Sequence, residues 1–534
     1  MDCVKPDIKA KTVGHDIPIP NSASISVKDP IDHLNHERRQ VERDVSERSG
    51  VVAVLGLGDY LAALQELRPG ADLIVWEPNK EAIDLFDKSA LIEKVDMERI
   101  EVVETLSGLK TALTQALVYG PAWMKAAVFV PEAYACAAPE EASKFRETVA
   151  HLKLRQASNL KTVFCRRWEW WENLCSNFGD VLKKAEASAA PGCIKGLPVV
   201  IAAAGPSLEK SIRAIRKNRE VVVVLAVGTV FKRLIAEGIR PDVVVMIEGQ
   251  DRADQISAEV ALNDSILTVS STTHPAHLRQ RALKTVVFHS APWIAELTGD
   301  WPFVPNGGNV ASAAFTLAVL WGGNPIVLVG QDLAYSDGER YANGARSPEV
   351  RIDAAKMTQI PGNRDTGVWA TSEMISYLSW YEESAKYLAR VRPDIDLVNA
   401  TDGGAKIKGF KHCRLTDVMR QVDGPTVKGR DRIMDGLRGF SRDFDLVERR
   451  LARLRRDTEY LSDLSEDQSL DLGDLISAVR AKPGPKMALG HLLGRPPKDE
   501  GLRSWIKSEL RIGLNDLYKL ACRLEPKVER TSAV

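Results

Sequence analysis

The chain has 534 residues, of which 44% are hydrophobic and 27% charged, values typical of a folded globular protein rather than a disordered one. Its 72 Lys and Arg residues balance 72 Asp and Glu residues, which argues against a strongly basic nucleic-acid-binding protein. No apolar run approaches the roughly 20 residues needed to cross a bilayer. We therefore expect no nucleic-acid partner, no membrane association and, at roughly 100–200 residues per domain, about three domains.

The seven cysteines are scattered, odd in number and free of any C-x-x-C pair. This pattern suits a reducing compartment and argues against a disulfide framework or a structural zinc site. The first residues also lack the apolar core of a signal peptide. The sequence therefore predicts a cytoplasmic protein.

The first part of the chain predicts a lead-in followed by a nucleotide-binding-like unit. Residues 1–45 are polar and dotted with prolines, so we expect a partly disordered lead-in. Residues 46–185 are predicted to form a Rossmann-like domain, with buried strands at 51–55, 72–76, 100–103 and 126–130 alternating with helices. Gly56, Gly58 and Glu77 fit a dinucleotide turn, but the third glycine is missing. Tight packing without a ligand is therefore the favoured interpretation.

An aromatic segment closes this domain. Residues 166–172 read Arg-Arg-Trp-Glu-Trp-Trp-Glu. Such rings could stack on a base, but more often they pack a helix between domains, and packing is the favoured interpretation.

The central region, residues 190–415, predicts a doubly wound parallel sheet. Continuous apolar runs at 198–204, 221–227, 243–247, 266–270, 285–288 and 326–329 alternate with helical patterns. In such a sheet ligands bind at the carboxyl ends of the strands, near the point where the strand order reverses. The residues that follow each strand are therefore the candidates for a binding site.

These strand ends are rich in Gly, Ser, Thr, Asn and Asp. Gly205 permits a tight turn, Pro206 fixes φ, and Ser207 is a good N-cap for the next helix. A second glycine-rich loop opens another helix, and exposed N–H groups at helix starts suit a phosphate. The predicted nucleotide or nucleotide-sugar site comprises Gly205, Pro206, Ser207, Gly228, Thr229, Glu248, Thr272, Thr273, Asn306, Gly307, Gly308, Asn309 and Gln331.

Missing motifs narrow the chemistry. The sequence has no G-x-x-x-x-G-K-[ST] loop, no H-E-x-x-H motif and no G-x-S-x-G elbow. We therefore expect neither a Walker-type NTPase, nor a zinc enzyme of that kind, nor a serine hydrolase of that fold.

The last region, residues 425–534, predicts an α-helical domain. Apolar residues recur at helical spacing within a strongly charged sequence, which is typical of amphipathic helices packed on each other or on the core.

Several motifs together resemble a known family. Residues 205–208 (GPSL), 238–242 (GIRPD), 330–335 (GQDLAY) and 399–407 (NATDGGAKI) are similar, in order and spacing, to the bacterial motility accessory factors, or Maf proteins. These flagellin glycosyltransferases are built on an MptE-like domain. The resemblance implies a cytoplasmic enzyme that transfers pseudaminic or legionaminic acid from a CMP-activated donor to Ser or Thr of flagellin, supporting flagellum assembly and motility.

The central region also resembles bacterial CMP-sialic-acid sialyltransferases. There the Gly-Pro-Ser-Leu turn and the glycine loop hold CMP, and two tyrosines in a Y-x-x-G-x-x-Y spacing hold the leaving phosphate. Tyr335 and Tyr341 match that spacing, whereas the His that serves as base has no counterpart in residues 367–372.

A base is still required, and the sequence leaves it open among Asp332, Asp251, Glu248 and His274. The catalytic residues predicted are Asp332, Asp251, Tyr335 and Tyr341. We predict no metal site and no cofactor beyond the CMP-activated donor, with the need for a divalent metal and the oligomeric state left open.

Two alternative functions remain. One is a 6-hydroxymethylpterin pyrophosphokinase that uses ATP and Mg²⁺ held by carboxylates such as Glu248, Asp251 and Asp332. The other is a non-catalytic chaperone that binds flagellin.

Overall fold

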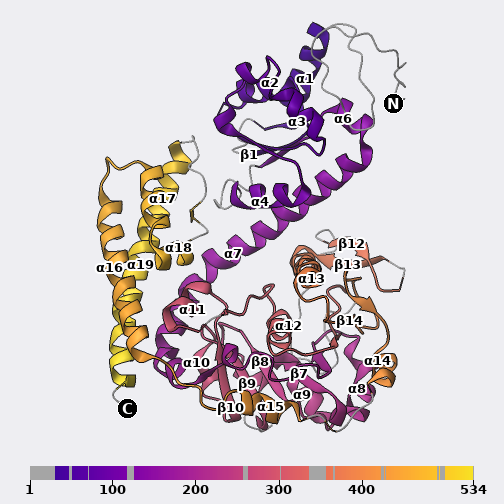
Figure 1. The fold of residues 1–534 in the computed structure, drawn as a ribbon, viewed down its shortest axis with the longest axis vertical. Helices are drawn as coiled ribbons and strands as arrows, with labels where there is room; N and C mark the ends of the chain where they lie inside the picture. The colour runs from indigo at the N-terminus through magenta and orange to yellow at the C-terminus, as the bar shows by residue number, and fades with distance from the viewer. Residues whose placement is uncertain are drawn as a thin grey trace. The chain divides into compact units, whose positions relative to one another are not determined.

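The computed structural model describes residues 30–46, 51–69, 71–116, 126–256, 262–300, 302–335, 357–364, 367–422, 426, 428–489, 492–493 and 500–532. The chain divides into two compact units (Figure 1). The first comprises Met1–Lys161, Tyr460–Lys482 and Leu489–Leu514, and the second comprises Thr162–Glu459, Pro483–Ala488 and Asn515–Val534.

The first unit contains a four-stranded parallel sheet of order β3-β2-β1-β4. Its strands are β1 (Val51–Leu55), β2 (Asp72–Trp76), β3 (Ile100–Val103) and β4 (Ala127–Phe129). Its helices include α1 (Pro30–Asp44), α2 (Tyr60–Leu67), α3 (Lys80–Phe86), α4 (Leu106–Ala116) and α6 (Glu132–Ala137), with 3₁₀ turns η1 (Ile92–Lys94) and η2 (Met97–Arg99). Alternate residues of β1 enter two separate apolar clusters, one on each face of the sheet. All four predicted strands are confirmed.

The glycine turn of this unit is filled by protein. Glu77 is buried, and its carboxylate accepts the N–H groups of Leu57 (3.3 Å) and Asn79 (2.9 Å) and the hydroxyl of Tyr134 (3.3 Å). Gly56 has a φ of +82°, and a side chain there would overlap the Tyr134 ring. Burial raises the pKa of Glu77, against the opposing effect of these hydrogen bonds. Glu77 thus fixes the turn, in agreement with the packing interpretation.

The second unit contains a nine-stranded parallel sheet of order β15-β14-β11-β6-β7-β8-β9-β10-β5. Its strands are β5 (Ala185–Glu186), β6 (Val199–Ala202), β7 (Val223–Val227), β8 (Val243–Met246), β9 (Leu262–Ser270), β10 (Ala282–Phe288), β11 (Ile326–Val329), β14 (Leu397–Asn399) and β15 (Lys411–His412). The order reverses between β6 and β11, which is the switch point of the sheet. A separate antiparallel hairpin pairs β12 (Met357–Pro361) with β13 (Gly367–Thr371).

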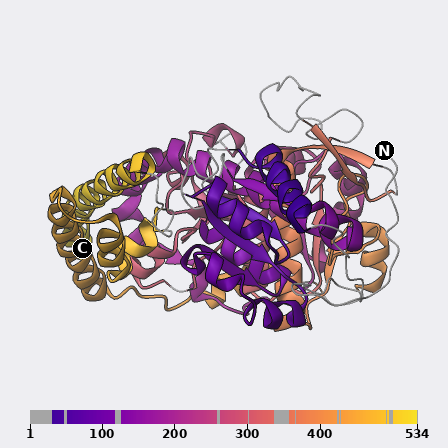
Figure 2. The same ribbon diagram turned by 90° about the horizontal axis from the view of Figure 1, so that it is seen from above.

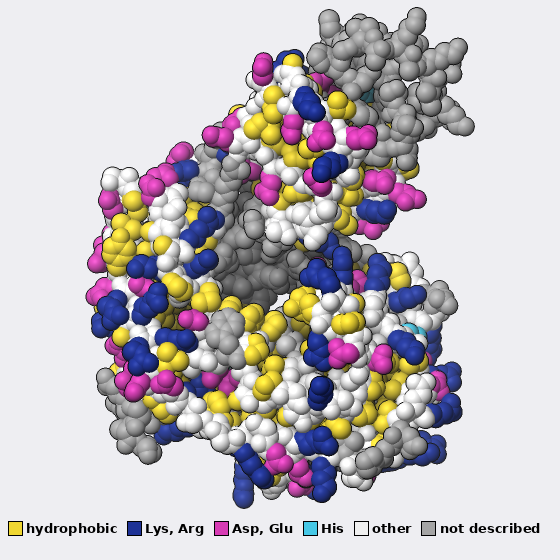
Figure 3. Space-filling model, in the orientation of Figure 1, with side chains coloured by type: hydrophobic (Ala, Val, Ile, Leu, Met, Phe, Trp, Pro, Cys, Tyr) yellow, Lys and Arg dark blue, Asp and Glu magenta, His cyan; other side chains and the backbone are white. Residues whose placement is uncertain are grey.

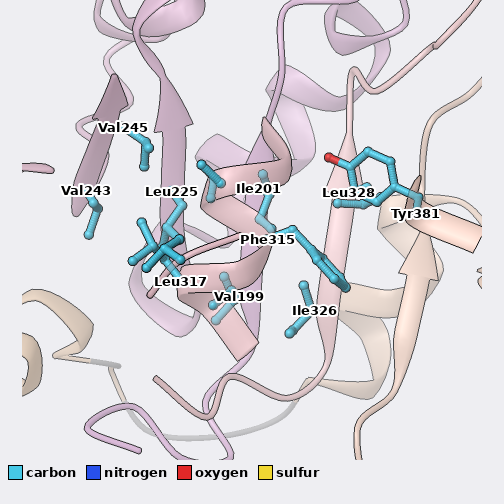
Figure 4. Packing of buried hydrophobic residues seen from close by; sticks show 14 of the residues in the cluster. Val199, Ile201, Leu225, Val243, Val245, Phe315, Leu317, Ile326, Leu328 and Tyr381 are labelled. Atoms are coloured by element: carbon cyan, nitrogen blue, oxygen red, sulfur yellow. The ribbon is translucent and has the colours of Figure 1, made fainter. Parts of the chain in front are cut away.

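Helices cover both faces of this sheet, as the sequence predicts. The helices of the central region are α8 (Leu208–Lys217), α9 (Gly228–Ala236), α10 (Pro275–Leu278), α11 (Pro292–Thr298), α12 (Val310–Leu320), α13 (Ser372–Val391) and α14 (Leu415–Gln421). Its 3₁₀ turns are η3 (Ala187–Ala189), η4 (Arg219–Val221) and η5 (Ala253–Gln255). Figure 4 shows Phe315 and Leu317 of α12 packed against β6, β7, β8 and β11, with Tyr381 of α13 beside them. The opposite face packs on α8, α9 and α14.

Helix α7 (Pro139–Lys183) is one 45-residue helix, and the aromatic segment 166–172 is part of it. No proline follows Pro139 within it, and its only glycine, Gly179, lies near its end, so nothing in the sequence interrupts the helix. Two side chains of its last turns anchor it to the sheet. Asn173 Nδ2 donates to Gly249 O (2.8 Å), and Asn177 Nδ2 donates to Thr273 O (2.8 Å).

The C-terminal region is helical, as predicted, with α15 (Gly429–Gly436), α16 (Phe444–Glu466), α17 (Leu472–Arg480), α18 (Pro483–Ala488) and α19 (Glu500–Ser532). Figures 1 and 2 show α16 and α19 side by side, and Arg455 of one pairs with Glu525 of the other at 2.9 Å. Charged side chains of both signs lie over these two helices (Figure 3). Among the helices described, none combines the length and apolar character that crossing a lipid bilayer requires.

Candidate functional site

A cavity of about 520 Å³ opens at the carboxyl ends of β6, β7, β8 and β11, at the switch point of the nine-stranded sheet. This volume falls within the roughly 300–1,000 Å³ of small-molecule sites. Seven of the predicted site residues line it: Gly205, Thr229, Glu248, Gly308, Asn309, Gln331 and Asp332.

One wall of the cavity is built by the turn after β6 and the carboxylate after β11. Asp332 is buried, and its Oδ2 accepts the Ser207 hydroxyl (2.7 Å) and the Ser207 N–H (3.3 Å). A side chain at Gly205 would overlap both Asp332 Oδ2 and the Gly330 carbonyl oxygen. Glycine is therefore required at 205 for the two loops to meet.

Ser207 differs from its predicted role. It precedes α8 with helical φ and ψ, and its side chain makes no capping hydrogen bond to the helix. Its hydroxyl donates to the Asp332 carboxylate. Ser207 thus positions Asp332 rather than capping α8.

The loop that carries Asp332 is held in an unusual conformation. Leu333 has a φ of +51°, a region that side chains other than glycine rarely adopt. The Asp332 carbonyl oxygen accepts the Ala405 N–H (2.7 Å), and Thr401 Oγ1 accepts the Gln331 N–H (3.2 Å). Residues of the 399–407 motif therefore hold this loop in place through two hydrogen bonds.

Two helices begin at the cavity. Thr229 lies in the first turn of α9, and Asn309 is the N-cap of α12, where its Oδ1 accepts the Ser312 N–H (2.8 Å). The Asn309 Nδ2 atom is buried and has no hydrogen-bond partner in the described part of the chain. Gly308 (φ +87°) faces the Tyr377 ring. The helix starts and the Asn309 amide thus offer donors to an anionic or hydroxylated ligand.

The loop after β8 carries Glu248 into the cavity. The Glu248 carbonyl oxygen accepts the His274 N–H (2.8 Å) and the Thr273 hydroxyl (3.0 Å). Burial raises the pKa of Glu248, although Arg252 and Arg166 oppose the rise.

The remaining predicted residues do not line the cavity. Thr273 is fully buried and its hydroxyl also bonds His277 Nδ1 (2.7 Å), while Thr272 Oγ1 bonds Ser270 Oγ (3.1 Å). Asp251 caps the following turn by accepting the Ala253 N–H (2.9 Å). These side chains form hydrogen bonds with other groups of the protein. The other predicted residues outside the lining are Pro206, Ser207, Gly228, Asn306 and Gly307.

The two tyrosines also differ from the predicted arrangement. Tyr335 belongs to the apolar core and its N–H donates to Trp369 O (2.8 Å), so its ring packs rather than lining the cavity. Tyr341 lies outside the described residues.

Two groups of lining residues have no place in the predicted site. One comes from α7, where Arg166 pairs with Glu169 at 2.7 Å and Trp170 lies against Gly249. The aromatic segment 166–172 indicates a possible ligand contact in the sequence, but there a packing role is the favoured interpretation. The other, Glu373, Met374 and Tyr377, comes from the first turns of α13 and carries no sequence signal.

The lining is more acidic than the sequence suggests. Its charged side chains are four carboxylates and one guanidinium: Glu169, Glu248, Asp332, Glu373 and Arg166. In the described part of the chain no three His, Cys, Asp or Glu side chains come together to hold a metal ion.

Comparison with known proteins agrees with this architecture. Residues 172–338 match the family model "6-hydroxymethylpterin diphosphokinase MptE-like". No curated protein matches the chain. Among solved structures, a Maf glycosyltransferase from Magnetospirillum magneticum AMB-1 is similar at a TM-score of 0.56 and 17% identity, over 97% of this chain and 87% of that chain. The fold class inferred from the sequence is thereby confirmed, and the comparisons agree with the resemblance read from the motifs: residues 172–338 match an MptE-like family model, and the chain shares the fold of a Maf glycosyltransferase.

Proposed function

We propose that the protein is a glycosyltransferase that moves a nonulosonic acid, pseudaminic or legionaminic acid, from its CMP-activated form to Ser or Thr of flagellin in the cytoplasm. The observation that carries the proposal is the cavity at the switch point, which is lined by residues of two of the motifs, Gly205 and 330–334.

The chemistry of the lining supports a nucleotide-activated sugar. The starts of α9 and α12 present backbone N–H groups to the cavity, which suits a phosphate without a lysine-bearing loop. Asn309 Nδ2 is an unused donor, and the Asp332 carboxylate is an acceptor for sugar or ribose hydroxyls. Arg166, the cation of the lining, suits the carboxylate that every nonulosonic acid carries.

The direct test is transfer with purified components. Flagellin is incubated with the protein and a CMP-nonulosonic acid, and its intact mass is measured. We expect mass increments of one nonulosonic acid per modified site. Unchanged flagellin with either donor, in a preparation that binds CMP, would contradict the proposed acceptor.

The family model's name favours one alternative, an ATP-dependent pterin pyrophosphokinase. A melting-temperature comparison with CMP and with ATP plus Mg²⁺ separates the two. We expect stabilisation by CMP, because a ligand that binds the folded state raises stability by RT ln(1 + [L]/Kd). Stabilisation by ATP alone would favour the kinase. A chaperone without a nucleotide site would respond to neither.

A further inference from the structure

The transfer needs a base, and the four carboxylates of the cavity are not equivalent. Asp332 Oδ2 holds the Ser207 hydroxyl, Glu169 pairs with Arg166, and Glu373 accepts the Tyr377 hydroxyl (2.6 Å). No group in the described part of the chain forms a hydrogen bond or ion pair with the Glu248 carboxylate. Glu248 is thus the lining carboxylate for which the described residues supply no hydrogen bond or ion pair, so both of its oxygens are available to a ligand hydroxyl.

The backbone below Glu248 is fixed by a set of buried contacts. Thr273 Oγ1 and His274 N both bond the Glu248 carbonyl oxygen, and the Thr273 hydroxyl also meets His277 Nδ1. His277 Nε2 in turn accepts the Arg252 N–H (2.9 Å). Burial lowers the pKa of His277 to about 4, so its ring is neutral and keeps this acceptor at neutral pH. Both ends of the loop after β8 are therefore pinned, as a catalytic group requires.

From this arrangement we infer that Glu248 is the catalytic base of the transfer, a role that rests on the proposed function. Its carboxylate takes the proton of the acceptor hydroxyl as that oxygen bonds the anomeric carbon of the sugar. The bond from the anomeric carbon to the phosphate oxygen breaks, and CMP leaves with the electron pair. Thr273, His274 and His277 are positioning residues. This role explains why they contact the loop that carries Glu248 without lining the cavity.

The charges around Glu248 give the inference a pH signature. Arg252 and Arg166 face it as cations and Glu169 as an anion, while burial favours its protonated form. Because the base must be ionised, transfer should fall as the pH drops through the raised pKa of Glu248. Removing Arg252, which lies outside the lining, should move this fall to higher pH.

The experiment compares Glu248→Gln with the control variant Glu220→Gln. Glu220 is an exposed carboxylate of η4. It precedes β7 and therefore lies at the end of the sheet opposite the cavity. Single-turnover transfer to flagellin is measured together with the Kd for CMP. We expect Glu248→Gln to lose about 10²–10⁴ of the rate, the usual contribution of a general base, with an unchanged Kd and melting temperature. Glu220→Gln should match wild type.

A second variant keeps the test sharp if Glu248→Gln folds poorly. Arg252→Gln should retain transfer at high pH but show its acidic fall at a higher pH than wild type. Transfer by Glu248→Gln within about threefold of wild type, or an unshifted pH profile in Arg252→Gln, would overturn the assignment. A wild-type protein that binds CMP but transfers nothing would instead contradict the proposed function, and the base assignment would fall with it.

Discussion

At the scale of single residues, the site depends on glycines and carboxylates that other side chains hold in place. Asp332 could reach the cavity only because Gly205 has no Cβ, and it stays there because Ser207 donates to it. The strained Leu333 follows directly, which is typical of residues that a surrounding structure forces into position.

The bond between Ser207 and Asp332 should be measurable as a coupling. Ser207→Ala removes a hydrogen bond to a buried carboxylate, which costs about 1.5–3 kcal/mol of unfolding free energy. In a double-mutant cycle, Asp332→Asn should cost less in the Ser207→Ala background than in wild type. Urea unfolding of the four proteins checks this. Additive costs would show that the two side chains do not interact.

The glycine requirement also has a matched control. An alanine at Gly205 would overlap Asp332 and the Gly330 carbonyl, whereas Gly238 has a φ of +73° but open space around it. Gly238→Ala should therefore cost only the backbone strain, about 1–2 kcal/mol. Gly205→Ala should lower the melting temperature further and abolish the stabilisation by CMP. Equal effects of the two substitutions would argue against a steric role for Gly205.

At the scale of secondary-structure elements, buried polar groups join the far edge of the sheet to the helices around it. His289, after β10, bonds Asp300 Oδ2 (2.9 Å), and the same carboxylate pairs with Arg442, which precedes α16. Burial alone would raise the pKa of Asp300, but His289 and Arg442 hold it low. Glu186 of the edge strand β5 lies near Asp300 and Arg442 as well, but burial raises its pKa.

Glu186 predicts a loss of stability at high pH. Burial raises its pKa to about 8, so the folded chain keeps a proton that the unfolded chain loses near pH 4.3. This contribution is complete below about pH 4 and is lost as the pH rises through about 8, on the order of 2 kcal/mol between pH 6 and 9. Melting temperatures at pH 6 and 9 should show a smaller fall for Glu186→Gln than for wild type. The same fall in both proteins would exclude Glu186 as the source.

At the scale of the whole molecule, the C-terminal region is not a separate appendage. Ile433 and Leu437 belong to the core of the second unit, Gly429 packs on Val223, and Arg442 reaches the buried Asp300. The first part of the predicted helical domain is thus needed to complete the central one.

Two truncations test this division. A chain that ends at Lys428 loses these core groups, so we expect it to be insoluble or to melt without a cooperative transition. A chain that ends at Asp443 keeps them and should still be stabilised by CMP. If both truncated chains bind CMP alike, residues 429–443 are dispensable for the fold of the second unit.

The sequence by itself determined where most strands and helices lie along the chain. Continuous β-branched runs gave buried parallel strands, because only a sheet covered on both faces hides such runs. The short strands β14 and β15 at one side of the sheet escaped prediction, because their three and two residues carry too little periodicity. The strand ends likewise located the cavity, since parallel strands bring their carboxyl ends to one edge.

Only the tertiary structure decided which side chains face that cavity. Ser207 and Thr273 have hydroxyls that could bind a ligand, but the Ser207 hydroxyl bonds Asp332 and the Thr273 hydroxyl bonds His277. No sequence pattern indicates these partners, because they are distant in the chain or buried by the fold. Arg166 and Tyr377 reach the cavity from α7 and α13, helices far from the strand ends in sequence. A helix presents a side chain to a site according to how it packs, and packing depends on contacts between distant residues. For that reason the sequence could place the cavity but not complete its lining.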